Sequence, residues 1–164
     1  AVKADELVLG EGFDRQFLTV QFLAVGLDAT ESACAVDRVI AQVGTDVGRQ
    51  PVGRLLSGGG MNPDVLLACI PMERVQALAA AGAADLSRVP AELLRSTLDA
   101  LAVAGYEAAG LTTDEADCLS EHVVGTYADA DLVALMSDLD LSADRAVAGL
   151  QACVTSDRAD QLGG

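Results

Sequence analysis

The sequence contains no tryptophan, and aromatic residues make up only 3% of its 164 residues. Hydrophobic residues nevertheless account for 51% of the chain, with alanine and leucine supplying most of the apolar bulk. A chain with this apolar content can form a core and is not disordered, in spite of its net charge. Because alanine and leucine favour helices whereas strands favour β-branched and aromatic residues, the composition predicts an all-α fold.

Positive charge is scarce as well. The chain has 10 Lys and Arg residues against 25 Asp and Glu residues, and its formal net charge is −15. Nucleic acids and anionic membrane surfaces attract basic surfaces, so this balance argues against both as partners. From Ser96 to Asp144 there are eleven carboxylates and no Lys or Arg. Such a stretch is typical of a solvated face, with a surface for cations or a basic partner as the alternative.

Long hydrophobic runs are missing too. The longest apolar stretches, Phe17–Leu27 and Leu98–Leu111, are interrupted by polar groups and are shorter than the roughly 20 residues that a transmembrane helix needs. We therefore expect no membrane insertion. No signal peptide is recognised, and the sequence begins with Ala1 rather than Met, as does a chain after signal cleavage or trimming.

The four cysteines form two pairs with the same spacing. Cys34 and Cys69 are 35 residues apart, as are Cys118 and Cys153. A shift of 84 residues superposes the pairs, and the match runs without a gap from about residue 11 to residue 78. Other identical residues under this shift are Ala24, Gly26, Leu27, Glu31, Val39, Leu55, Leu66, Ala68, Arg74 and Leu78, which fall on Ala108, Gly110, Leu111, Glu115, Val123, Leu139, Leu150, Ala152, Arg158 and Leu162. The pattern predicts a tandem duplication of one disulfide-stapled multi-helix unit.

Helix boundaries recur with the same spacing. The segments 26–31 and 110–115 each consist of Gly-Leu, a residue that can cap a helix, two further residues and Glu. We expect a helix to end at each glycine. Asp28 or Thr112 then caps a new helix, with the glutamate three residues later completing a capping box. Asn62 and Pro63 predict the start of a later helix that carries Cys69.

These signals divide the chain into four parts. Each unit is expected to contain a lead helix, a cysteine helix, a short connecting helix and a second cysteine helix. Ser142 opens the helix that carries Cys153, and Pro90 opens the long helix that leads into unit two. The parts are an N-terminal arm (1–12), helical unit one (13–78), a small-residue hinge (79–89) and helical unit two (90–164).

The opening Gly-Leu-x-x-x-Glu-x-x-Cys occurs at Gly26–Cys34 and again at Gly110–Cys118. This pattern resembles uncharacterised exported, Ala-rich helical domains of bacteria. The resemblance covers both units, implies export, and carries no activity with it.

Duplication favours Cys34–Cys69 and Cys118–Cys153 among the three pairings that four cysteines allow. Each bond would close a loop of 35 residues, which in the chain-entropy model stabilises by about 3.5–4 kcal/mol. Buried free thiols and a four-thiolate zinc site are the alternatives, although zinc sites usually contain cysteines close together in sequence. Disulfides imply an oxidising compartment, so we expect an extracellular or cell-surface protein.

Candidate chemical motifs are weak. His122, the only histidine, follows Cys118 by one helical turn, which would suit a nucleophile–base pair, but a bonded Cys118 leaves it a surface histidine. The Ser57–Gly60 run lacks the lysine and strand of a phosphate loop and predicts a flexible loop. The alternating acids around Asp138–Asp144 resemble the start of a calcium loop, but Ala143 and Gly149 stand where Gly and Glu are needed. We therefore expect no catalytic residues, no metal and no cofactor.

Two apolar groups are candidate contacts for a partner or ligand. The arm contains Leu7, Val8 and Leu9, which lie outside the repeated block, and the lead helix contains Phe13, Phe17 and Phe22 on one broad face. Core packing is the simpler interpretation of the phenylalanines. The sequence favours an exported, non-enzymatic protein that acts through protein contacts, as a structural, adaptor or self-assembling subunit. The alternative is a carrier of a small apolar ligand in a helical cavity.

The pairing can be tested chemically. Non-reducing peptide mapping is expected to find Cys34 linked to Cys69 and Cys118 linked to Cys153. A bond between cysteines of different units, or four free thiols, would contradict the repeat.

Overall fold

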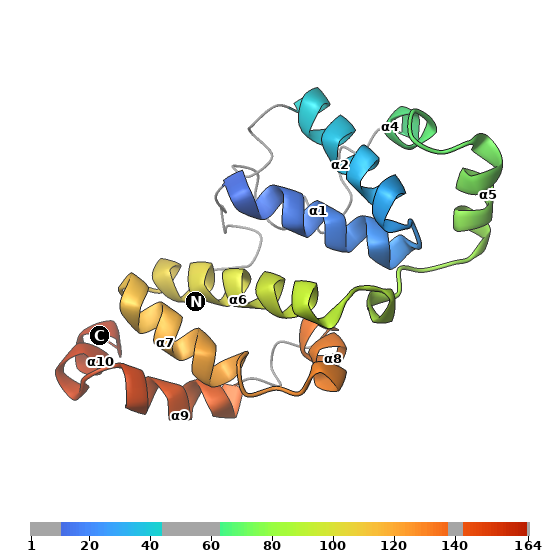
Figure 1. Ribbon diagram of the computed structural model, residues 1–164. Coiled ribbons are helices and arrows are strands. Elements are labelled where there is room, and N and C mark those ends of the chain that lie inside the picture. The colour runs from blue at the N-terminus through green and yellow to red at the C-terminus, as the bar shows by residue number, and fades with distance from the viewer. Residues whose placement is uncertain (1–10, 44–62, 138–142, 164) are drawn as a thin grey trace. The chain divides into compact units, whose positions relative to one another are not determined.

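A computed structural model of the chain describes residues 11–43, 63–137 and 143–163, and its regular structure in these ranges is entirely helical (Figure 1). The helices up to residue 90 are α1 (Glu11–Val25), α2 (Ala29–Val43), α4 (Pro63–Leu67), α5 (Met72–Ala80) and the 3-10 helix η3 (Leu86–Arg88). Those that follow are α6 (Ala91–Ala108), α7 (Thr113–Val123), the 3-10 helix η4 (Asp129–Asp131), α8 (Leu132–Ser137), α9 (Ala143–Cys153) and α10 (Ser156–Gly163). The all-α prediction is confirmed.

The chain divides into two compact units, with the division between Leu93 and Leu94 near the start of α6. We call them the N-terminal and the C-terminal unit. The expected hinge at 79–89 holds the end of α5 and the helix η3. This segment is bonded to the end of α1, because the Asp85 N–H and the Arg88 guanidinium both donate to the Ala24 carbonyl, at 2.8 and 3.2 Å.

Each unit turns a sharp corner between its first two helices. Gly26 and Gly110 have φ angles of +106° and +101°, in the left-handed region that glycine enters without strain. The next residue closes each helix end: Leu27 N–H donates to the Phe22 carbonyl and Leu111 N–H to the Tyr106 carbonyl, both at 3.1 Å. The predicted helix ends are therefore confirmed.

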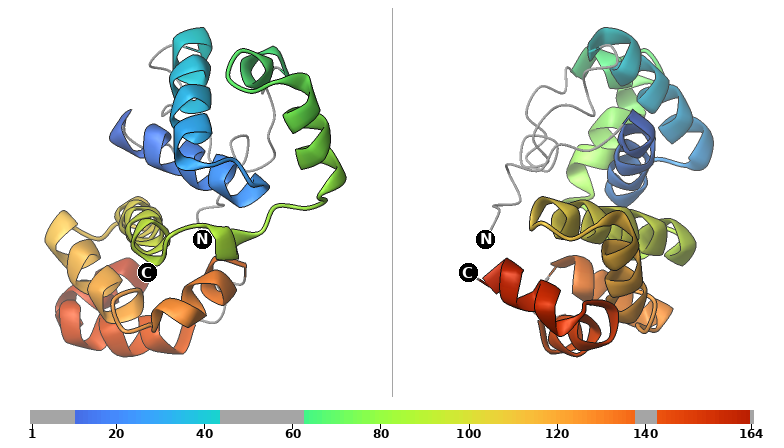
Figure 2. Two further views of the ribbon diagram at one scale, coloured as in Figure 1. Left: turned by 45° about the vertical axis from the view of Figure 1, so that its right-hand side comes forward. Right: turned by 90° about the vertical axis from the view of Figure 1, so that its left-hand side faces the viewer.

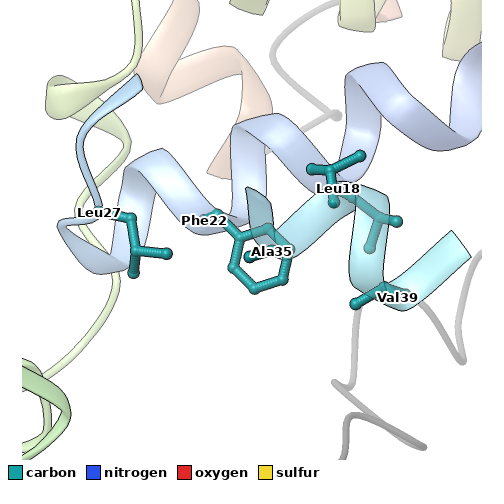
Figure 3. Close-up of a cluster of buried hydrophobic side chains, with 6 residues drawn as sticks. Leu18, Phe22, Leu27, Ala35 and Val39 are labelled. Atoms are coloured by element: carbon teal, nitrogen blue, oxygen red, sulfur yellow. The ribbon is translucent and has the colours of Figure 1, made fainter. Parts of the chain in front are cut away.

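The core of the N-terminal unit lies where α1 and α2 cross (Figure 3). Leu18 and Phe22 reach it from α1, Leu27 from the corner, and Ala35 and Val39 from α2, which also contributes Val36. Three partly buried side chains, Ile40, Leu66 and Leu78, complete it. Apolar residues spaced three or four apart give α2 one face for this contact, as its sequence predicts.

In the C-terminal unit α7 packs against α9, and the two helices lie side by side in both Figure 1 and Figure 2. Leu119 and Val123 of α7 are buried, as are Leu132 and Leu135 of α8. Arg95 of α6 ties this unit together by donating to the Val124 and Tyr127 carbonyls, at 2.9 and 2.8 Å.

Among the described residues, no helix is long and apolar enough to span a membrane.

Some boundaries differ from the prediction. Helix α1 begins at Glu11, so the last two residues of the expected arm belong to a helix, while residues 1–10 lie outside the described ranges. Helix α4 ends at Leu67, and Cys69 lies in the turn that follows it, whereas Cys153 ends α9. Pro71 follows this turn. Thr155 occupies the corresponding position after α9.

Two α-helices were not predicted. Helices α5 and α10 follow the second cysteine of each pair and begin at Met72 and Ser156. Pro71 is the N-cap of α5, with an extended backbone (φ −67°, ψ 154°). The starts of the expected helices at Asn62 and Ser142, and the loop at 57–60, lie outside the described residues.

One buried residue differs in polarity between the corresponding helices. Ser32 of α2 is fully buried, and its hydroxyl has no hydrogen-bond partner among the described residues. A shift of 84 residues places it on Ala116 of α7, which is also fully buried. A buried hydroxyl without a partner costs free energy that an alanine methyl does not.

Replacing Ser32 by alanine is therefore expected to raise the free energy of unfolding by about 1 kcal/mol. The reverse change, Ala116→Ser, should lower it by about the same amount. Urea unfolding of the two variants and the wild type measures both effects. A Ser32→Ala variant less stable than the wild type would contradict this account.

Candidate functional site

The two disulfides join the predicted cysteines. Cys34 is bonded to Cys69 and Cys118 to Cys153, and the Cα atoms of the two pairs are 5.8 and 5.7 Å apart. All four cysteines are partly exposed. The first bond ties α2 to the turn after α4, and the second ties α7 to the end of α9. A distant segment is thus fixed to the helix that follows each glycine corner.

An arginine ties a further helix to the corner of the N-terminal unit. Arg74 of α5 donates from Nη2 to the Gly26 carbonyl at 2.9 Å. It also binds both carboxylate oxygens of Glu31, through Nε at 3.2 Å and Nη2 at 3.3 Å. We call this arrangement of arginine, glutamate and glycine carbonyl the arginine bridge. It joins the end of α1, the first turn of α2 and α5.

The same bridge occurs in the C-terminal unit. Arg158 of α10 donates to the Gly110 carbonyl at 3.1 Å and to the two oxygens of Glu115 at 3.3 and 3.2 Å. Leucines one turn further along α5 and α10 lie against the corner glycines. A Cβ atom built on Gly26 would lie 3.2 Å from the Leu78 side chain, and one on Gly110 would lie 3.0 Å from that of Leu162.

Each glutamate of a bridge also belongs to a capping box. Glu31 accepts from the Asp28 N–H at 2.9 Å and donates its own N–H to the Asp28 carboxylate at 2.8 Å. Glu115 accepts from the Thr112 N–H at 2.8 Å, and its N–H donates to the Thr112 hydroxyl at 3.3 Å. The predicted capping boxes are therefore present. One carboxylate in each unit satisfies both a helix terminus and an arginine.

These donors change the acidity of the glutamates. The hydrogen bond from Arg158, followed by the backbone bond from Thr112, lowers the pKa of Glu115 from 4.5 to about 2. The hydrogen bond from Arg74, followed by the backbone bond from Asp28, also lowers the pKa of Glu31. Both carboxylates stay ionised at neutral pH, so both bridges are charged.

The phenylalanines predicted as contacts are buried. Phe17 and Phe22 are almost fully buried and Phe13 is 7% exposed. The rings of Phe13 and Phe17 stack with their centroids 5.5 Å apart, whereas Phe22 belongs to the core cluster of Figure 3. Their contact with a partner or ligand stays a prediction. Leu7, Val8 and Leu9 lie outside the described residues.

Helix α7 carries a strip of negative charge. Asp114, Asp117 and Glu121 are exposed, and their spacing of three and four residues places them on one face of the helix. In α2 the corresponding positions hold Thr30, Ala33 and Asp37. Asp37 forms an ion pair with Arg15 of α1 at 2.7 Å. The acidic stretch of the sequence thus includes an exposed helical face on the C-terminal unit.

His122 lies against the second disulfide. Its Nδ1 atom is 3.1 Å from the Cys118 carbonyl oxygen and 3.6 Å from Cys153 Sγ. The imidazole and the two sulfurs lie within 4.8 Å of one another, a spacing that suits a metal ion. The sulfurs are bonded to each other, however, and a metal would need them as free thiolates. In its oxidised form this cluster is therefore a disulfide with a neighbouring imidazole.

Neither the arginine bridges nor this contact of His122 was predicted from the sequence. Arg74 and Arg158 stood out as identical residues under the shift of 84, which was the available signal. Nothing in the sequence pointed from His122 to Cys153. Comparison with protein families, curated proteins and solved structures finds no match to this chain.

The bridge in the C-terminal unit predicts a specific dependence of stability on pH. Because the pKa of Glu115 is lowered on folding, its ionised form stabilises the folded state above about pH 4.5. This contribution is lost as the pH falls from 4.5 towards about 2. The melting temperature of the wild type should therefore fall more steeply across this range than that of Glu115→Gln.

Asp114→Asn is the matched control, because it removes an exposed carboxylate from the same turn of α7 without touching the bridge. This control should keep the slope of the wild type. Parallel melting curves for the wild type and Glu115→Gln would show that the bridge does not couple folding to pH.

Proposed function

We propose that this chain is an exported protein built from two copies of one helical unit, and that it acts through contacts with other protein chains. The proposal rests on one observation: the same set of stabilising contacts occurs in both units. The glycine corner, capping box, arginine bridge and disulfide appear twice, and each member of one set is 84 residues from its counterpart. A shared ancestor explains this recurrence simply.

Two disulfides support export. Such bonds persist in oxidising compartments outside the cytoplasm, and they suit small helical units that contain few aromatic residues. The resemblance of the Gly-Leu-x-x-x-Glu-x-x-Cys segments to exported bacterial domains points the same way. The disulfides and arginine bridges also favour binding, because a surface that is already rigid loses little conformational entropy when a partner docks.

Charge restricts how copies of the chain can meet. The net charge is −15, and the face of α7 formed by Asp114, Asp117 and Glu121 would repel the same face of another copy. Self-association therefore needs an apolar contact away from this face. The triplet Leu7, Val8 and Leu9 is the candidate, because it lies outside the repeated block and has no counterpart in the second copy. We propose that this triplet packs against a neighbouring chain.

Deletion of residues 1–10 is expected to convert an associating protein into a monomer and to leave helical content and both disulfides unchanged. The variant Leu7→Ser, Val8→Ser, Leu9→Ser should behave in the same way. Deletion of residues 1–5 keeps the triplet and is the control that should still associate. Sedimentation velocity of the four proteins, with circular dichroism for helical content, makes the comparison.

Salt gives a second measurement on the same samples. Raising the ionic strength screens the repulsion between acidic copies, so association through an apolar contact should strengthen. If the triplet packs on its own chain instead, the deletion lowers the melting temperature and every variant sediments as a monomer. A full-length protein that stays monomeric at high concentration would contradict self-association.

A further inference from the structure

The two disulfides differ in what lies beside them. In the C-terminal unit the imidazole of His122 is 3.6 Å from Cys153 Sγ. The corresponding position beside Cys34 is occupied by Arg38, an exposed residue of α2. His122 is the only histidine of the chain, so the Cys34–Cys69 bond has no imidazole of its own unit near it.

The contacts of His122 define the role of its nitrogen. Nδ1 lies 3.1 Å from the Cys118 carbonyl oxygen, which can only accept a hydrogen bond. A hydrogen bond between these two atoms therefore has Nδ1 as its donor. The same N–H group lies next to Cys153 Sγ, so a hydrogen-bond donor is already placed at one sulfur of the disulfide.

Gly149 contributes to this placement. A Cβ atom built on Gly149 of α9 would lie 2.6 Å from Cδ1 of Leu119 and 3.1 Å from Cβ of His122. The backbone of α9 thus approaches α7 closely at the turn that holds the imidazole. Gly149 is buried, whereas His122 is exposed and Cys118 and Cys153 are partly exposed.

We propose that Cys118–Cys153 is a thiol-exchange site, at which an external thiol opens the disulfide with His122 as the proton donor. The thiolate of the reagent attacks Cys118 Sγ and forms a mixed disulfide with it. The Cys118–Cys153 bond breaks, and its electron pair leaves on Cys153 Sγ. Nδ1–H of His122 stabilises this thiolate by a hydrogen bond, and an imidazolium transfers its Nδ1 proton to it, which leaves a neutral imidazole.

A dithiol completes the reduction. Its second thiol attacks the reagent sulfur of the mixed disulfide and releases Cys118 as a thiolate, while the reagent departs as a cyclic disulfide. Two electrons pass from the dithiol to the protein. The substrate class is thus a thiol or dithiol, and Cys153 is the leaving group because the donor lies at its sulfur.

Partial reduction of the intact protein tests this assignment. The oxidised chain is treated with limiting dithiothreitol, quenched with an alkylating reagent at set times and mapped by mass spectrometry. Cys118 and Cys153 should be labelled before Cys34 and Cys69. A donor at the departing sulfur is expected to speed exchange by roughly threefold or more, so His122→Ala should slow opening of this pair by that factor.

Three comparisons separate proton donation from a general change in stability. Arg38→Ala removes the residue at the matching position and should leave both rates unchanged. His122→Asn keeps an amide donor near the position of Nδ1 and should retain part of the rate. Brief treatment with the monothiol glutathione should place the mixed disulfide on Cys118.

Either of two results would overturn the proposal: opening of Cys34–Cys69 first in the wild type, or equal slowing of both disulfides by His122→Ala. Circular dichroism of the oxidised variants checks that the helices are intact. Because His122 is exposed, we expect its replacement to leave the helical content unchanged.

Discussion

The bidentate contact between an arginine and a glutamate organises both units. In each unit the glutamate lies in the first turn after a glycine corner, and the arginine lies on a helix more than forty residues later. The planar guanidinium suits this position because it can bind two carboxylate oxygens and still donate to the glycine carbonyl, which a lysine ammonium cannot do with the same geometry. One side chain thereby satisfies a helix end that the left-handed glycine would otherwise leave open.

The disulfide and the arginine bridge stabilise each unit in different ways. The disulfide restricts the conformations of the unfolded chain, because it closes a loop of 35 residues whether or not the helices are formed. The bridge acts only in the folded state, since its three groups meet only when the corner and the later helix are in place. Apolar packing can then be modest, and the small cluster around Phe22 in the N-terminal unit contains a single aromatic ring.

Local patterns made much of this fold predictable. The Gly-Leu-x-x-x-Glu segments predicted both corners and capping boxes, because a capping box depends only on residues three positions apart. The equal spacing of the cysteines predicted the disulfide partners. The corners and the disulfide partners could thus be predicted from residue spacing alone. The contacts of Arg74 and of His122 could not, because they depend on where α5 lies against the corner and on how closely α9 approaches α7 at Gly149.

The placement of the disulfides also determines what a protease can release. Any single cut between Cys34 and Cys69, or between Cys118 and Cys153, leaves both fragments joined through sulfur. A chain cut once in either loop would therefore keep its two fragments together until a reductant opened the bond. This resistance to fragmentation does not depend on the free energy of folding.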